Sequence, residues 1–202
     1  MWWNELQAQT DGLADMRPHV DQGADVSPEA TLRGAVEIGA GTRICAGAYI
    51  EGPVRIGRHC LVGNNSLIRG ATVIGDHCRI GFATELKHAW LGQRVSVGPQ
   101  CFVADSRVDN DVYLGALVRT SNHRLDATTV KVMQNGELQD TGMDKLGAWI
   151  GANAALGVGV IILPGRVVAA GTELGPRITV EKNLPSGRYR LAQQLHCLQS
   201  LE

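Results

Sequence analysis

The sequence predicts an all-β fold in which one chain winds into a single-stranded parallel β-helix of six-residue repeats. An aliphatic residue recurs at every sixth position from Val20 to Leu86, and the residue four positions after each is small or medium-sized through Thr84. Glycine is frequent, with 25 residues, whereas aromatic residues make up 4% and leave a narrow aliphatic core. A period of six fits a short strand followed by a tight turn, because an α-helix repeats every 3.6 residues.

Three repeats close one coil of about eighteen residues, so residues eighteen apart are expected to stack at the strand spacing of roughly 4.8 Å. Beyond the first run, the step shortens to five at Leu91 and at Val108. The pattern is absent from residues 121–149 and resumes at Ile150. We therefore expect residues 121–149 to form a loop that protrudes from a coil, because repeat proteins place insertions in this way.

The insertion carries its own turn signal. Asn135-Gly136 lies between two short alternating stretches and predicts a hairpin with a type I′ turn. Around it, the β-helix is expected to span residues 20–185. Residues 1–19 are interpreted as an N-terminal cap, and residues 186–202 as a short C-terminal helix with leucines on one face.

The overall charge and hydropathy exclude several classes of protein. The formal net charge of -1 and an isoelectric point near 6.6 provide no basic surface for nucleic acid. No stretch approaches the length of about eighteen apolar residues that a membrane span needs, and the first residues do not resemble a signal peptide. Five cysteines without such a signal indicate free thiols, and we therefore expect a cytoplasmic protein.

Two His-Cys pairs, His59-Cys60 and His77-Cys78, are separated by one full coil and invite a metal-site interpretation. The register places both cysteines at the inward small position, so the histidines point elsewhere and the four side chains cannot converge on one ion. A zinc site of the carbonic anhydrase type needs three histidines, and His88 and His123 have no third histidine near them in the sequence. No metal is predicted.

Arg69 and Lys87 are the cations that the register brings together. They are eighteen residues apart and each follows an inward aliphatic residue, so they should stack on one outer face, with Glu51 a further coil below. Two aligned cations suit a phosphate group. The alternative is a solvated charge pair on an ordinary surface.

Three segments resemble a specific family: GFATELKHAWLG, then FVADSRVDNDVYLGA followed by Asn122, and then VKVMQNGELQDTGMDKLGAWIGANAALGVGVIILPG. From about Ile38 to Pro185 the chain is similar to the acetyltransferase domain of the bifunctional enzyme that makes UDP-N-acetylglucosamine. The resemblance implies a left-handed β-helix, a homotrimer with the active site between subunits, and acetyl-CoA or another acyl-CoA as co-substrate. The nucleotidyltransferase domain of that enzyme is absent from this sequence.

The resemblance also implies roles for individual residues. Arg69 and Lys87 match the basic residues that hold the sugar phosphate, and Glu85 matches an acidic residue near the catalytic base. Asn122 matches an asparagine at the start of the active-site loop, and Lys131 matches a lysine further along it. A sugar phosphate is therefore the expected partner molecule.

The chain departs from the family pattern where the amino sugar would lie. The catalytic histidine is replaced by Pro99, an aromatic hydroxyl by Phe102, and a sugar-contacting asparagine by Tyr113. Since proline cannot accept a proton, a base has to come from another direction. His88 beside Lys87, or His123 beside Asn122, is the candidate.

Two functions remain open on the sequence alone. The first is an acyltransferase that moves an acetyl or other acyl group from CoA to a sugar phosphate or amino sugar, with a different acceptor, such as a hydroxyl, as one variant. The second is a catalytically degenerate β-helix that binds a sugar phosphate or nucleotide sugar, or that scaffolds a separately encoded nucleotidyltransferase. The position of His88 and His123 relative to Arg69 and Lys87 should distinguish them.

Overall fold

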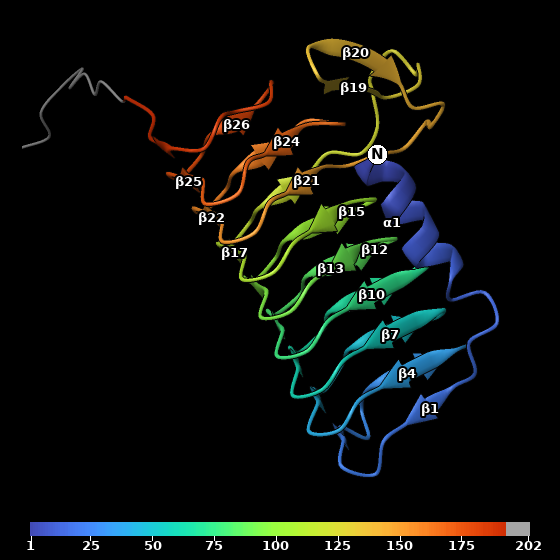
Figure 1. Ribbon diagram of the computed structural model, residues 1–202. Helices are drawn as coiled ribbons and strands as arrows, with labels where there is room; N and C mark the ends of the chain where they lie inside the picture. The colour runs from blue at the N-terminus through green and yellow to red at the C-terminus, as the bar shows by residue number, and fades with distance from the viewer. Residues whose placement is uncertain (193–202) are drawn as a thin grey trace, which may run out of the picture.

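The computed structural model describes residues 1–192 and confirms a left-handed parallel β-helix. Successive coils stack along one axis, and each coil contributes one short strand to each of three parallel sheets (Figure 1). We name these sheets A, B and C in the order in which the chain enters them. Residues in register are eighteen apart in the first coils, as in the pairing of Val36 with Val54, and seventeen apart where the sequence step shortens, as in the pairing of Val73 with Trp90.

Sheet A forms the face against which the N-terminal helix packs. Its strands, in spatial order, are β1 (His19–Val20), β4 (Val36–Ile38), β7 (Val54–Ile56), β10 (Thr72–Ile74), β13 (Trp90–Leu91), β16 (Arg107–Val108), β21 (Trp149–Ile150) and β24 (Val167–Val168).

Sheet B follows after one turn of each coil. Its strands are β2 (Asp25–Val26), β5 (Arg43–Ile44), β8 (Leu61–Val62), β11 (Arg79–Ile80), β14 (Ser96–Val97), β17 (Tyr113–Leu114), β22 (Ala155–Leu156), β25 (Glu173–Leu174) and β27 (Arg188–Tyr189). The C-terminal helix predicted over residues 186–202 lies partly outside the described residues. Within them, Arg188–Tyr189 pair in parallel with β25.

Sheet C carries the residues of the candidate site. Its strands are β3 (Thr31–Arg33), β6 (Tyr49–Glu51), β9 (Leu67–Arg69), β12 (Glu85–Lys87), β15 (Phe102–Ala104), β18 (Arg119–Thr120), β23 (Ile161–Ile162) and β26 (Thr179–Val180).

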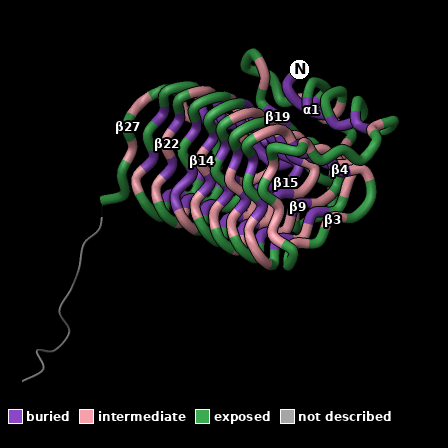
Figure 2. The backbone as a smooth tube through the Cα atoms, turned by 90° about the horizontal axis from the view of Figure 1, so that it is seen from below, coloured by how far each residue is buried: buried purple, intermediate pink, exposed green. Residues whose placement is uncertain are grey.

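The core is a continuous column of aliphatic side chains inside the coils. Ile38, Ile50 and Ile68 are fully buried, and buried and exposed positions alternate along the coils (Figure 2). The predicted six-residue period is confirmed, because the inward aliphatic residues of successive coils stack on one another, with Thr120 in the inward position of β18. Burial of apolar surface at roughly 25 cal/mol per Å² is the main contribution that stabilises such a column.

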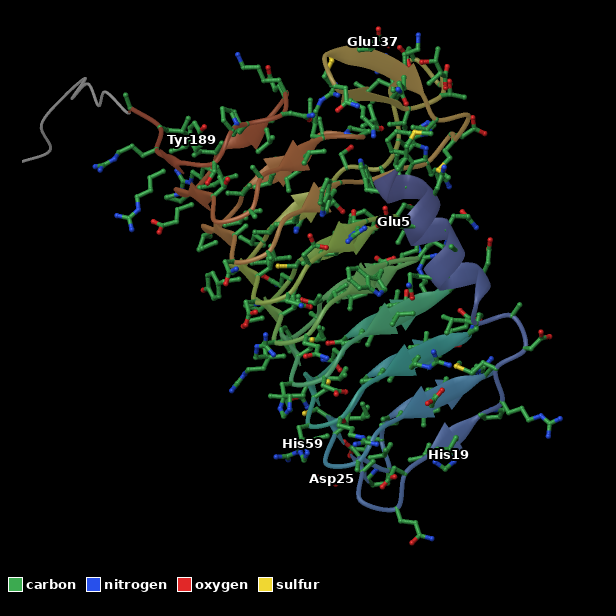
Figure 3. The ribbon with its side chains drawn as sticks, in the orientation of Figure 1. Glu5, His19, Asp25, His59, Glu137 and Tyr189 are labelled. Atoms are coloured by element: carbon green, nitrogen blue, oxygen red, sulfur yellow. The ribbon has the colours of Figure 1, made fainter. Side chains whose placement is uncertain are left out.

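The inward small positions hold hydroxyls and thiols that bond to turn carbonyls. Thr42 Oγ1 donates to the carbonyl of Gly57 at 2.7 Å, and the Cys60 thiol donates to the carbonyl of Gly75 at 3.1 Å. Cys60 and Cys78 point inward, as the register predicts. His59 and His77 are exposed and their rings stack on one another, with centroids 5.1 Å apart, so the four side chains do not converge. Figure 3 shows His59 at an outer corner of the β-helix.

The insertion forms an antiparallel hairpin of β19 (Lys131–Gln134) and β20 (Glu137–Asp140). Asn135 and Gly136 both have positive φ, 49° and 83°, as a type I′ turn requires, so the predicted turn is confirmed. The hairpin stands above the coil edge beside the N-terminus (Figure 1), and Glu137 lies at its outer end (Figure 3).

Residues 1–19 contribute the helix α1 (Trp2–Asp11), which lies along the side of the β-helix against β10, β13 and β16 (Figure 1). The expected N-terminal cap therefore covers a flank rather than an open end. Trp2, Trp3 and Leu6 share the buried face of α1 and form a second core with Val130, Val132 and Leu146 of the insertion. This core ties the start of the chain to the insertion. Among residues 1–192, no helix is long and apolar enough to cross a membrane.

Candidate functional site

A buried carboxylate, Asp105, is the centre of the candidate site. It lies at the corner where the chain turns from sheet C to sheet A, and 6% of the residue is exposed. Its Oδ2 lies 3.0 Å from Nζ of Lys87 and accepts a hydrogen bond from Nδ2 of Asn122 at 2.5 Å. Its Oδ1 lies 3.2 Å from Nδ1 of His88. Three predicted site residues thus meet at one carboxylate.

Successive coils place His88 and Asp105 at the same corner. Both have positive φ, 47° and 48°, a conformation that is uncommon for residues with a side chain. The backbone holds them there, because the His88 N–H donates to the Arg69 carbonyl at 3.1 Å and the Asp105 N–H donates to the Lys87 carbonyl at 2.9 Å. Sparsely populated backbone conformations are found at functional sites, where the surrounding structure enforces them.

The insertion delivers Asn122 to this corner. The Leu146 N–H donates to the Asn122 carbonyl at 2.9 Å, and the Gly147 N–H donates to the Asp105 carbonyl at 2.7 Å, so both ends of the insertion are fixed beside Asp105. A Cβ on Gly147 would lie 2.1 Å from the carbonyl oxygen of Ala104, so this close approach requires glycine.

The electrostatics keep Asp105 ionised. Burial by itself raises the pKa of this carboxyl, because a charge is costly to desolvate. The contacts from His88, Asn122 and Lys87 outweigh burial and hold the pKa below its ordinary value. Asp105 is therefore a fixed negative charge that can orient and stabilise a cation beside it.

His88 has one ring edge against Asp105 and the other toward solvent. Its Nδ1 is buried and lies within ion-pair distance of Asp105, although the contact does not meet hydrogen-bond geometry. The side chain is 28% exposed, and Nε2 is not among the buried unpaired atoms. A carboxylate beside one ring nitrogen favours the proton there and leaves the other nitrogen as a proton acceptor. An imidazole placed in this way can act as a general base that a neighbouring carboxylate orients.

Arg69 and Lys87 stack as predicted, and Glu51 lies one coil below Arg69. Both cations are already paired within the chain. Arg69 Nε donates to Oε1 of Glu85 at 2.9 Å, and Lys87 pairs with Asp105. The sequence prediction did not include these carboxylates as partners of the two cations.

His123 and Lys131, the remaining predicted site residues, lie outside the Asp105 cluster. His123 is exposed, and its Nδ1 lies 3.3 Å from the carbonyl of Asp144. Lys131 lines a separate cavity between the hairpin and the coil of Arg166. Of the two candidate bases, the structure therefore brings His88 to the other predicted residues and leaves His123 apart from them.

Asp105 is the site residue that the sequence prediction missed. It lies seventeen residues after His88, which is the spacing of one coil at this point, because Lys87 pairs with Ala104. A search for opposite charges at coil spacing would have found it.

Comparison with known proteins identifies the family. A model of the bacterial transferase hexapeptide, described as six repeats, matches residues 35–70. The chain is 57% identical over 162 residues to the uncharacterized acetyltransferase YaiX of Escherichia coli O6:K15:H31, which covers 80% of this chain and 70% of that protein. The chain belongs to the hexapeptide transferase family.

Two more distant proteins are also similar to parts of this chain. The bifunctional sugar-1-phosphate nucleotidylyltransferase/acetyltransferase of Sulfurisphaera tokodaii is 33% identical over 107 residues, which are 53% of this chain and 27% of that protein. The structure of UDP-N-acetylglucosamine acyltransferase from Francisella novicida aligns with 84% of this chain and 55% of its own, at 14% identity and a TM-score of 0.41.

In this member of the hexapeptide transferase family, Pro99 and His88 lie at different corners of the coil. Pro99 is in the turn between sheets B and C, where its carbonyl accepts the N–H of Leu117 at 3.0 Å. His88 follows β12, at the corner between sheets C and A. The position at which the resemblance places a base is thus separated from His88 by the width of sheet C.

Proposed function

We propose that this protein is a CoA-dependent acyltransferase in which His88 is the general base and Asp105 is the residue that positions it. The observation that carries the proposal is the placement of Nδ1 of His88 at 3.2 Å from Oδ1 of a buried, ionised Asp105. Membership of a family whose relatives are named acetyltransferases supports acyl transfer as the reaction class.

The proposed reaction is a single acyl transfer. Nε2 of His88 removes a proton from an amine or hydroxyl of the acceptor as the acceptor atom attacks the thioester carbon of acyl-CoA. The new bond to the acyl carbon forms, the carbon–sulfur bond breaks, and the CoA sulfur leaves with a proton returned by the imidazolium. Asp105 stabilises the imidazolium during this exchange, because its charge lies beside the opposite ring nitrogen.

The proposed acceptor is a sugar phosphate or amino sugar. The Sulfurisphaera tokodaii relative carries sugar-1-phosphate in its name, which supports this substrate class. Arg69, Glu85, Lys87 and Asn122 border the corner of His88 and are the proposed acceptor contacts. Lys131 would contribute from the insertion.

We propose a homotrimer with the active site between subunits. Exposed apolar side chains follow the corner between sheets B and C, among them Phe82, Leu117 and Val158, which are 50%, 40% and 49% exposed. Contiguous exposed apolar residues are typical of an interaction surface. The free cysteines of the described chain suit a reducing compartment such as the cytoplasm.

A second candidate is a binding or scaffold protein without catalysis, including one that serves a separate nucleotidyltransferase. Two observations favour it: Pro99 occupies the position of the family's base, and His88 does not reach hydrogen-bond geometry with Asp105.

The deciding experiment measures release of the CoA thiol from acetyl-CoA against a panel of amino sugars and sugar phosphates. We expect acceptor-dependent release, a loss on the order of 10²–10⁴-fold in His88→Gln, and near-normal rates in the matched variant His123→Gln. Release that is unaffected by His88→Gln would refute His88 as the base. No release with any acceptor, together with binding of a sugar phosphate, would establish the scaffold instead.

A further inference from the structure

A second polar cavity lies between the hairpin and the coil beneath it. Arg124, Lys131 and Arg166 line it together with the carboxylates of Asp126 and Asp140. The three cations come from three places in the chain: the start of the insertion, strand β19, and the turn before β24. Three positive and two negative side chains leave the cavity with one net positive charge.

The two carboxylates of the cavity are largely occupied by other donors. Asp126 accepts hydrogen bonds from Nη2 of Arg124 at 2.6 Å and from the hydroxyl of Thr128 at 2.9 Å. Asp140 accepts the hydroxyl of Thr129 at 2.8 Å and the backbone N–H of Gly142 at 2.9 Å. Asp140 is directly opposite Lys131 in the hairpin register. The Gly142 N–H, the Thr129 hydroxyl and the charge of Lys131 hold the pKa of Asp140 below its ordinary value, although the two side chains form no ion pair within 4.0 Å.

Lys131 and Arg166 therefore carry charge that no carboxylate within residues 1–192 neutralises by an ion pair. Arg166 donates from Nε to the carbonyl of Glu181 at 2.8 Å, which fixes the side chain without cancelling its charge. Burial and the neighbouring Arg124 lower the pKa of Arg166, as expected for like charges held close together.

The fold holds this cluster in place. A Cβ on Gly165 would lie 2.8 Å from the carbonyl oxygen of Lys131, so the glycine lets the hairpin pack directly on the coil. Asn183 adds a second link, because its Nδ2 donates to the carbonyl of Met133 at 3.3 Å while its Oδ1 accepts the N–H of Val167 at 2.9 Å. The cations are thus arranged before any ligand arrives.

This cavity differs from the site at Asp105 in how its cations are paired. There, Arg69 is paired with Glu85 and Lys87 with Asp105, so a phosphate at those cations has to compete with carboxylates already in place. At the hairpin cavity, Asp140 lies opposite Lys131, but within residues 1–192 no carboxylate comes within ion-pair distance of Lys131 or Arg166. Guanidinium and ammonium groups with uncompensated charge form strong, charge-assisted hydrogen bonds to phosphate oxygens.

We propose that the hairpin cavity, formed by Arg124, Lys131 and Arg166, binds a phosphoryl group. The site does not depend on acyl transfer. It lies close to the site at Asp105, since Arg124 follows two residues after Asn122, which itself contacts Asp105. The phosphoryl group belongs either to a phosphorylated acceptor or to the phosphates of CoA, and both present the same chemistry to these cations.

The test is calorimetric titration of the full-length protein with inorganic pyrophosphate, followed by glucosamine 1-phosphate and by CoA. We expect Lys131→Ala and Arg166→Ala each to raise the dissociation constant for pyrophosphate on the order of tenfold, because each removes one charge-assisted contact. Lys145→Ala is the matched control, since Lys145 is an exposed lysine of the same insertion outside the cavity. It should change the constant less than twofold.

The ligand arms identify the source of the phosphoryl group. If the Lys131 and Arg166 variants weaken glucosamine 1-phosphate and leave CoA unchanged, the acceptor supplies it; the reverse result assigns it to CoA. The proposal is overturned if pyrophosphate does not bind, if Lys145→Ala weakens it equally, or if Arg69→Ala weakens it while Lys131→Ala does not. Because no step measures acyl transfer, these outcomes stay distinct from a failure of the catalytic proposal.

Discussion

His88 and Asp105 occupy the same corner of two successive coils, and Nδ1 of His88 lies 3.2 Å from Oδ1 of Asp105. Both residues have positive φ, and their side chains meet at this corner. A histidine that follows one strand is thereby brought into contact with a carboxylate one coil later, although seventeen residues separate them in the sequence. Four predictions follow from this corner and from the elements that support it.

The charge of Asp105 should stabilise the fold in a pH-dependent way. Because its folded-state pKa is lower than the ordinary value near 4, its contribution is present above that value and is lost as the pH falls through the lowered pKa. We expect Asp105→Asn to reduce the free energy of unfolding by about 1.5–3 kcal/mol at pH 7. Urea unfolding measured from pH 7 to pH 2.5 should show the difference from the wild type shrinking below about pH 4.

Asp144→Asn is the control for that series, because Asp144 is an exposed aspartate of the insertion. It should have little effect at any pH. If Asp105→Asn lowers the free energy of unfolding by the same amount at pH 7 and at pH 2.5, the effect comes from altered packing or hydrogen bonding and not from loss of the charge.

Asn122 should act by orienting and solvating Asp105. On the proposed acyl transfer, Asn122→Ala should lower kcat/KM on the order of tenfold, since it removes one hydrogen bond to a charged group. Asn122→Asp should cost more, because a second carboxylate 2.5 Å from Oδ2 of Asp105 raises the pKa of one of the pair. The pH profile of kcat/KM should therefore shift for Asn122→Asp and keep its shape for Asn122→Ala.

Asn64→Asp, on an exposed turn of a lower coil, provides the matched control and should leave both rate and profile unchanged. Equal losses from the alanine and aspartate variants, with unshifted profiles, would argue against a role for Asn122 in setting the charge of Asp105.

Gly147 should be intolerant of a side chain. Its added Cβ would lie 2.1 Å from the Ala104 carbonyl oxygen and 2.1 Å from Oγ of Ser106, so Gly147→Ala must displace backbone beside Asp105. We expect a loss of about 1–3 kcal/mol in stability, measured by urea unfolding. Gly12→Ala should be close to neutral, because the nearest atoms to its Cβ would lie at 3.5 Å. Similar stabilities for the two variants would contradict the close approach seen at Gly147.

The second core should loosen independently of the coils. All four tryptophans of the chain, Trp2, Trp3, Trp90 and Trp149, belong to or pack against this core, so their fluorescence reports on α1 and the insertion. Leu6→Ala removes a buried side chain and should weaken the docking of α1 by about 2–5 kcal/mol. In this variant, the tryptophan emission should shift to longer wavelength at urea concentrations lower than those at which the β-sheet circular dichroism signal is lost.

Ile56→Val, inside the coils, should destabilise the β-helix without separating the two transitions. It should lower the circular dichroism midpoint through a loss of about 0.5–1.5 kcal/mol, without an earlier change in fluorescence. Coincident fluorescence and circular dichroism transitions in Leu6→Ala would show that α1 and the β-helix unfold as one unit.

The stacking of Arg69 over Glu51 and under Lys87 was predictable from the sequence, because register follows from the six-residue count. The partners of those cations were not predicted. Arg69 pairs with Glu85 and Lys87 pairs with Asp105, and these pairings depend on how the side chains are oriented at each corner. His88 was named as a candidate base, whereas the carboxylate beside it was missed.

Spacing along the chain was enough to predict the β-helix, its coil length, the inward cysteines and the hairpin turn at Asn135-Gly136. These features are local or periodic, and each follows from the spacing of aliphatic residues or from the backbone preferences of a few residues. Three contacts could be seen only in the folded chain: Asn122 reaches Asp105, α1 covers a flank, and Lys131 and Arg166 line one cavity. Those contacts join segments that share no period, so they depend on how the insertion and α1 pack on the finished coils.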